Sequence, residues 1–294
     1  VLERSIKHIV KNLDLTKLSD ENLFLVAFNP NNYLRNEVVE CFIDIPTEFD
    51  KGDFGIYDLN GNEIEKQIVK IEPHQPVLEQ LIDRPMYFNM VRYHCFVDLK
   101  NVPEFGYKSF WLKPVGKSKV KSAFGGQKSK VELAKKNTIE NDYLKIKIYV
   151  NGTFDLFDKV NKKDFKGLGY FYDEGEAGHA WVNIPTKPFI TTLKNKPKIK
   201  IIRNGEIKAS FKISHKIKLT LNLTERKKKN PKLVLVDVDL FISLNKNSKR
   251  VELKVEVDNR AESHRLRIMF PTNIDAKFHF GEGQFGVVKR ASER

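Results

Sequence analysis

Three consecutive pieces of sequence decide the fold class: Tyr143-Leu-Lys-Ile-Lys-Ile-Tyr-Val150, the dipeptide Asn151-Gly152, and Thr153-Phe-Asp-Leu-Phe-Asp158. In the two longer pieces apolar and polar side chains alternate, which is the pattern of a strand with one buried and one solvated face. Asn-Gly is a strong signal for a tight turn between two such strands. The stretch therefore predicts an antiparallel β-hairpin over residues 143–158.

The β pattern continues on both sides of this hairpin. Lysines alternate with apolar residues over 198–213 and 216–223, and further β-rich runs follow up to Phe270. Shorter β-rich runs, separated by turn residues, fill residues 23–112 and predict a small β-sandwich. We therefore expect a mainly β protein with an N-terminal amphipathic helix, a small β-sandwich, and then part of a large antiparallel β-sandwich.

Composition divides the chain into four segments. Apolar residues recur at helical spacing near the start, so residues 1–18 are expected to contain an amphipathic helix, and residues 19–115 the small β-sandwich. Gly, Ser and Lys dominate residues 116–130, which predicts a linker or exposed loop before the large β-sandwich of residues 131–294. Because the chain begins with Val1 and shows no secretory signal, we expect it to be a piece of a longer protein.

The net charge of +14 over 294 residues is unevenly distributed. Residues 187–232 contain 15 basic and only two acidic residues, so binding of a polyanion is one candidate function. Most of these cations are lysines that alternate with apolar residues, which favours the solvated faces of strands, and we expect no nucleic-acid partner. No apolar run approaches the roughly 18 residues that cross a bilayer as a helix, so we expect no membrane partner.

The cysteines and histidines do not predict a metal site. Cys41 and Cys95 are the only cysteines, too few for a disulfide framework, and two buried unreactive thiols are favoured over a bridge or a nucleophile. The seven histidines show neither the HxH nor the HExxH spacing. We therefore expect no cofactor in this chain.

Two short clusters concentrate polar groups. Residues 170–181 contain three acids, one histidine, four aromatics and two glycines, and we interpret them as one loop. Carboxylates accept hydrogen bonds from sugar hydroxyls and rings stack on sugar faces, so a carbohydrate site and an exposed acidic turn are supported equally. Residues 258–267 carry three arginines and a histidine, for which a solvated loop held by local ion pairs is favoured.

These two clusters, in this order, resemble the C-terminal region of glycoside hydrolase family 38 α-mannosidases. The resemblance covers nearly the whole chain. It departs from many members after Gly178, where His179-Ala-Trp181 replaces Asp-Glu-Tyr, a change that bears on which sugar is accepted. The most specific matching stretches are Asp173-Glu-Gly-Glu-Ala-Gly178, Asn259-Arg260, His264-Arg-Leu-Arg267 and Phe270-Pro-Thr272.

The resemblance implies a division of labour within a longer enzyme. Family members have an N-terminal α/β domain with zinc, an aspartate nucleophile and an acid/base carboxylate, followed by a three-helix bundle and β-sandwich domains. They cleave α-mannosides with retention, which requires two carboxylates about 5 Å apart. Residues 1–18 would then be the last helix of the bundle and residues 131–294 part of a mutarotase-like supersandwich, which we expect to be incomplete. Zinc and both carboxylates would lie outside this chain.

The implied function is that of a non-catalytic C-terminal portion of an α-mannosidase, which contributes a loop to the substrate site. The partners would be the α-mannoside, through the full-length enzyme, and its own N-terminal catalytic domain; the oligomeric state is open and a cytoplasmic location is favoured. A stand-alone β-sandwich carbohydrate-binding module is the alternative. Asp173 and Glu176 are expected to accept hydroxyl hydrogen bonds, and Tyr170 or Trp181 to stack. The full set of expected substrate-binding residues is Tyr170, Asp173, Glu176, His179, Trp181, Arg260, His264 and Arg265.

Overall fold

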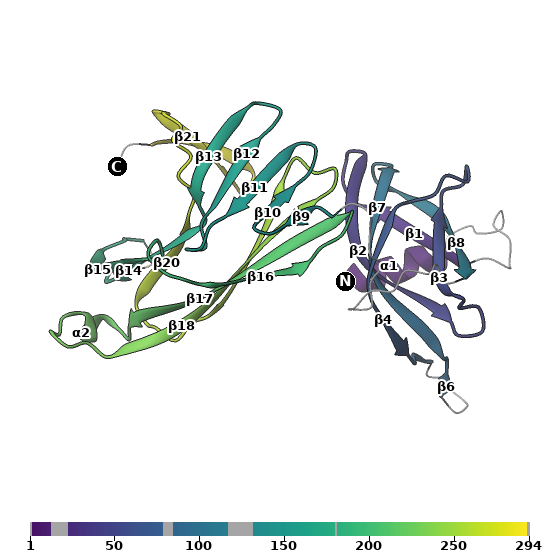
Figure 1. The fold of residues 1–294 in the computed structure, drawn as a ribbon, viewed down its shortest axis with the longest axis horizontal. Coiled ribbons are helices and arrows are strands. Elements are labelled where there is room, and N and C mark those ends of the chain that lie inside the picture. Colours follow the sequence, from purple (N-terminus) through teal and green to yellow (C-terminus); the bar gives the residue numbers. More distant parts are fainter. Residues whose placement is uncertain (1, 13–22, 79–84, 117–131, 180, 293–294) are drawn as a thin grey trace. The chain divides into compact units, whose positions relative to one another are not determined.

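The computed structural model describes residues 2–12, 23–78, 85–116, 132–179 and 181–292, and these are mainly β (Figure 1), as the alternation of side chains predicts. The chain divides into two compact units, residues 1–131 with 205–208, and residues 132–204 with 209–294. Of the segment expected to be an N-terminal helix, Leu2–Lys11 forms α1, and residues 13–18 lie outside the described residues. Residues 117–130 of the expected linker also lie outside them.

The first unit is the predicted small β-sandwich. It contains two three-stranded antiparallel sheets, with strand orders β1-β8-β3 and β2-β7-β4, and a short β5-β6 pair. The strands are β1 (Leu23–Asn29), β2 (Arg35–Pro46), β3 (Gly52–Tyr57), β4 (Lys66–His74), β5 (Val77–Leu78), β6 (Met86–Tyr87), β7 (Met90–Val102) and β8 (Gly106–Gly116).

The core of this unit is built around the central strand β7. Tyr93, Cys95 and Val97 alternate along it and are at most 1% exposed. Phe54 of β3 and Phe110 of β8 pack into the same core from the other sheet. Because both sheets contribute apolar side chains to one cluster, neither sheet is stable without the other.

The second unit holds four sheets. Their strand orders are β13-β12-β11-β10-β9, β15-β14-β20, β16-β17-β18-β19 and β21-β22. The strands of the first half are β9 (Ala134–Lys135), β10 (Thr138–Glu140), β11 (Leu144–Ile148), β12 (Phe154–Asp158), β13 (Lys163–Leu168), β14 (Tyr170–Glu176) and β15 (Pro185–Thr191). Those of the second half are β16 (Lys198–Arg203), β17 (Lys208–Thr220), β18 (Leu233–Asn245), β19 (Val251–Asp258), β20 (His264–Met269), β21 (Phe278–Gly283) and β22 (Gly286–Ala291).

The predicted hairpin over residues 143–158 is confirmed as β11 paired with β12. Its turn uses Gly152, whose φ of 86° lies in the left-handed region that favours glycine, and the backbone N–H of Gly152 donates to Tyr149 O at 2.9 Å. Leu144, Ile146 and Ile148 of β11 are at most 6% exposed, while Lys145 and Lys147 between them are exposed. The lysines therefore lie on the solvated face, as the alternation predicts.

β17 and β18 form the centre of the core of this unit. Every second residue of β18 from Val236 to Leu244 is fully buried. The predicted stretch 198–213 divides into β16 and the first part of β17, and the stretch that begins at Lys216 continues β17 to Thr220. In β17, Lys216 and Lys218 are exposed and His215 points inward with 2% exposure. Among the described residues the helices are α1 and the four-residue α2 (Leu223–Arg226), and neither is long and apolar enough to span a membrane.

Candidate functional site

The first polar cluster, residues 170–181, lies on a strand and the turn that follows it. Residues Tyr170–Glu176 form β14, so the interpretation of the whole cluster as one loop is wrong: β14 is the central strand of the sheet β15-β14-β20 and inserts Phe171 into the core. In the antiparallel register Gly175 lies opposite His264 on β20. The sheet therefore brings the two sequence clusters side by side, although about 90 residues separate them.

Asp173 lies at the centre of a buried polar network. Its side chain is 1% exposed, Oδ1 accepts a hydrogen bond from Arg226 Nη2 at 2.7 Å, and Oδ2 lies 2.5 Å from His264 Nδ1. Arg226, itself 2% exposed, also donates from Nη1 to Pro188 O at 2.9 Å. A buried carboxylate is stable only when it is paired and hydrogen-bonded. Asp173 therefore joins β14 to β20 and α2.

His264 extends the network to the loop before β20. Its Nε2 lies 3.0 Å from Asn259 Oδ1, an oxygen that also accepts the backbone N–H of Ala261 at 3.1 Å. Both ring nitrogens thus face side-chain oxygens, one on β14 and one on the loop before β20. His264 therefore holds the 259–261 loop segment against Asp173, which is a positioning role.

Glu174 carries a second set of ion pairs on the same strand. It is 4% exposed, and its carboxylate oxygens lie 3.0 Å from Arg267 Nη2 and 3.7 Å from Arg265 Nη1. The Arg267 guanidinium also lies 4.8 Å from the ring centroid of Tyr172, and that ring stacks on Phe189 at 5.9 Å. The side chain of Arg265 is 40% exposed, so its guanidinium reaches solvent at the edge of this layer.

Glu176 braces the turn that connects β14 to β15. Its Oε1 accepts the backbone N–H groups of Gly178 at 2.7 Å and Ile184 at 2.8 Å, and its Oε2 contacts the side-chain amide of Asn183. These hydrogen bonds, above all the one from Ile184, lower the pKa of Glu176 below its usual range. The carboxylate is therefore engaged with its own turn and fixes the turn's conformation.

The tip of this turn presents Trp181. His179 and Val182 exchange backbone hydrogen bonds of 3.0 and 3.1 Å, and Trp181 donates its backbone N–H to His179 Nδ1 at 3.3 Å. A Cβ at Gly178 would lie 1.8 Å from Val182 O, so only glycine fits there. The Trp181 side chain is 90% exposed. The turn therefore displays a large aromatic ring on a closed and braced backbone.

Two expected site residues lie apart from the network. Tyr170 begins β14 and is paired with Met269, at the opposite end of the strand from Gly175. Arg260 lies on the exposed loop between β19 and β20, and its Nε is 3.1 Å from Asp258 Oδ2, as the local ion-pair interpretation predicts. That hydrogen bond raises the pKa of Arg260.

Arg226 is the network residue that the sequence analysis missed. It lies in the basic segment 187–232, directly before Lys227-Lys-Lys229, where a solvated face was the favoured interpretation. A helix cap in the sequence signals where Arg226 lies. Asn222 is the N-cap of α2, the helix that ends at Arg226, and its Oδ1 accepts the backbone N–H of Glu225 at 3.0 Å. No group of three or more His, Cys, Asp or Glu side chains that could hold a metal occurs within the part of the chain that the structure describes.

One family model and one curated relative match this chain. Residues 139–294 match the model of the glycosyl hydrolases family 38 C-terminal domain. A curated relative from Halalkalibacterium halodurans, named "Putative mannosylglycerate hydrolase", is 24% identical over 202 residues, which are 63% of this chain and 22% of the relative. This chain therefore spans about a fifth of that relative's length.

Two solved structures share the fold. An alpha-mannosidase from Enterococcus faecalis V583 superposes with a TM-score of 0.79 at 20% identity, covering 99% of this chain and 36% of that one. A protein in the glycosyl hydrolase family 38 from Enterococcus faecalis gives a TM-score of 0.77 at 20% identity, covering 98% and 37%. The chain thus corresponds to little more than a third of each solved structure.

Proposed function

The chain belongs to glycosyl hydrolase family 38, and from that premise we propose that it is the non-catalytic C-terminal portion of a retaining α-mannosidase. The names of the curated relative and of one solved structure refer to a mannosylglycerate hydrolase and an alpha-mannosidase, which supports an α-mannoside as the substrate of the whole protein. The two catalytic carboxylates and the zinc ion would belong to an N-terminal catalytic domain.

The observation that carries the substrate-site role is Trp181. A tryptophan that is 90% exposed is unusual unless its ring meets a ligand or another surface, because it leaves a large apolar area in water. The hydrogen bonds that Glu176 accepts from the turn backbone fix the turn, so little conformational entropy is lost when the ring stacks on a sugar face. We assign stacking to Trp181, supporting polar contacts to His179 and Arg265, and positioning to Asp173 and His264.

A second surface supports docking on the rest of the enzyme. Phe278, Phe280, Val287 and Val288 of the β21-β22 pair are 49–68% exposed. Exposed apolar side chains gathered on one hairpin mark interaction surfaces. We assign this surface to the contact that this chain makes with the N-terminal catalytic domain.

The test compares two exposed aromatics in the full-length enzyme. Trp181→Ala should lower kcat/KM for an aryl α-mannoside five- to tenfold, since a stacked aromatic contributes about 1 kcal/mol. Phe105→Ala is the matched control, because Phe105 is also a strongly exposed aromatic, at 75% exposure between β7 and β8, and belongs to neither assigned surface. Equal activities of the two variants would contradict the role of Trp181.

The isolated chain separates this proposal from the alternative. We expect it to show no hydrolysis of an aryl α-mannoside and weak or no binding of mannose oligosaccharides. Saturable binding by the isolated chain, lost in Trp181→Ala, would support a stand-alone carbohydrate-binding module instead. Turnover by the isolated chain would contradict its non-catalytic assignment.

A further inference from the structure

The two cysteines of the chain face each other across neighbouring strands of the first unit. Cys41 on β2 lies directly opposite Cys95 on β7 in the antiparallel register, and their Sγ atoms are 3.7 Å apart. Directly opposed residues on antiparallel strands have Cα atoms about 4.5–5.5 Å apart, within the range of about 4.4–6.8 Å that a disulfide spans. Both thiols are free. The backbone therefore already holds the pair at a spacing that a disulfide needs.

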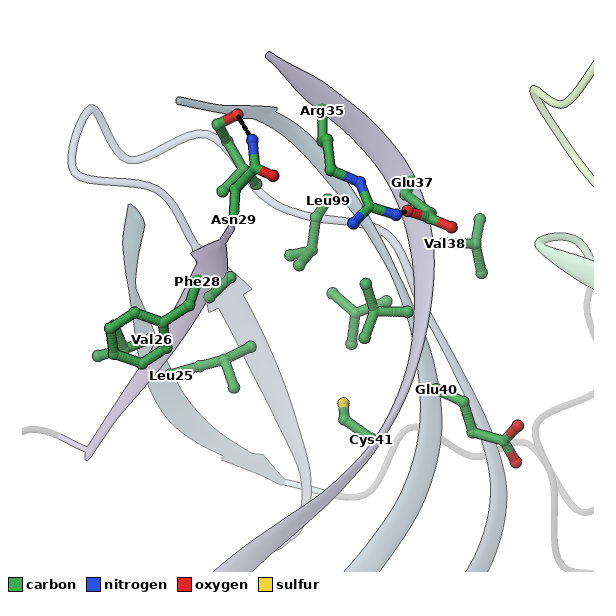
Figure 2. A pocket seen from close by; sticks show the side chains of 14 residues that line it. Leu25, Val26, Phe28, Asn29, Arg35, Glu37, Val38, Glu40, Cys41 and Leu99 are labelled. Atoms are coloured by element: carbon green, nitrogen blue, oxygen red, sulfur yellow. Dashed lines mark hydrogen bonds and ion pairs between the residues drawn. The ribbon is translucent and has the colours of Figure 1, made fainter. Parts of the chain in front are cut away.

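One of the two thiols is reachable from a cavity. Cys41 is half-buried and lines a cavity of about 600 Å³ between β1 and β2, whose walls include Leu25 and Leu99. Figure 2 shows the Cys41 sulfur directed into this cavity, below the ion pair between Arg35 and Glu37. Cys95 is 1% exposed, lies beside Cys41 on the neighbouring strand, and is not part of the cavity lining. A small oxidant that enters the cavity therefore meets Cys41 first.

The hydrogen bond between the thiols differentiates them chemically. With Cys95 as the donor, it lowers the pKa of Cys41, against the opposing effect of burial. The same hydrogen bond, together with burial, raises the pKa of Cys95 far above its usual range. Because the thiolate is the reactive form, Cys41 is the nucleophile that reacts with the oxidant. Cys95 is the resolving thiol, which then reacts with the oxidised Cys41.

We propose that Cys41 and Cys95 are a reversible oxidation site that closes to a disulfide when hydrogen peroxide enters the cavity between β1 and β2. In the first step the Cys41 thiolate attacks one peroxide oxygen, the O–O bond breaks, and the departing hydroxide takes a proton to leave as water. The Cys41 sulfur is thereby oxidised to a sulfenic acid, and the peroxide is reduced. In the second step the Cys95 sulfur attacks the Cys41 sulfur, the S–O bond breaks, and the Cys95 proton leaves with the hydroxyl as a second water.

The first test uses the purified, reduced chain and hydrogen peroxide. The wild-type protein should lose about 2 Da, for the two thiol hydrogens, and both titratable thiols, and should yield a peptide that links Cys41 to Cys95. Cys95→Ala should accumulate a sulfenic acid at Cys41 that dimedone traps, while Cys41→Ala should keep its thiol. Circular dichroism checks that both variants are folded.

The second test needs no variant. In glutathione redox buffers, the native chain should form the disulfide at a ratio of oxidised to reduced glutathione at least about tenfold lower than the urea-unfolded chain does, because the fold holds the two sulfurs together. Equal ratios, dimedone labelling at Cys95, or disulfide-linked dimers as the main product would each overturn the proposal.

Discussion

Acidification should destabilise the second unit through His215. This residue occupies an inward-facing position on β17, is 2% exposed, and neither of its ring nitrogens has a hydrogen-bond partner among the described residues. The ring of Phe171 packs against it edge-on at 5.5 Å, and its Nε2 is so close to Gly152 that a Cβ there would lie 2.7 Å away. Burial lowers the pKa of His215 from 6.5 to about 4, because the imidazolium would lose its hydration without gaining an acceptor.

The sign and size of the effect follow from the two pKa values. His215 is neutral in the folded protein down to about pH 4, whereas in the unfolded chain it binds a proton below 6.5. The contribution to stability is therefore complete above pH 6.5 and is lost as the pH falls towards 4. Linkage gives a loss of about 2 kcal/mol between about pH 7.5 and pH 5, and of about 3 kcal/mol once the full shift is reached.

The assay compares the wild type with His215→Leu by urea unfolding, followed by circular dichroism, at both pH values. Carboxylates titrate in both proteins, so they cancel when the pH-induced changes in unfolding free energy are subtracted. Hydrogen exchange of β17 peptides at both pH values identifies the second unit as the part that loosens. If the variant loses as much unfolding free energy as the wild type between these pH values, the assignment of a buried, neutral His215 is refuted.

Two further pairs of substitutions test the site and the hairpin. Arg226→Met removes one partner of the buried Asp173 and should lower the unfolding free energy in urea by about 3 kcal/mol. The double variant with Asp173→Asn should lose less unfolding free energy than the sum of the two single variants. Strict additivity of the losses would show that the two groups are not coupled. Gly152→Ala should cost about 2 kcal/mol or more, because it combines a φ of 86° with a clash against His215. Gly61 has a similar φ of 84° but open space around it, so Gly61→Ala should cost only the backbone strain of about 1 kcal/mol. Equal shifts in Tm for Gly152→Ala and Gly61→Ala would exclude the clash with His215.

The alternation of side chains was sufficient to predict most of the strands. It specified the hairpin at Asn151-Gly152 and the solvated faces that carry the lysines, because a half-buried strand needs period two wherever it lies. It failed at residues 204–207, where the stretch 198–213 divides into β16 and β17, and at residues 214–216, which continue β17 although two separate basic stretches were predicted there. Continuing the alternation from Ile213 through His215 to Ile217 would have placed the histidine in the core.

The candidate site was predictable in composition and not in arrangement. The clusters of residues 170–181 and 258–267 were identified, and the structure brings Asp173 and His264 together. Their roles depend on which side chains are buried, and that follows from the position of β14 between β15 and β20. Arg226 could not be separated from the neighbouring lysines, since its burial depends on a strand 53 residues away in sequence.

The amino-acid sequence by itself determined the class of structure, the hairpin, the family resemblance and the residue types of the site, because periodicity, turn chemistry and short motifs are local properties. Only the tertiary structure decided that Asp173 is a buried anchor, that Trp181 is displayed on a braced turn, and that Cys41 faces Cys95. These are matters of register and burial, and they arise when strands distant in sequence pair and exclude water.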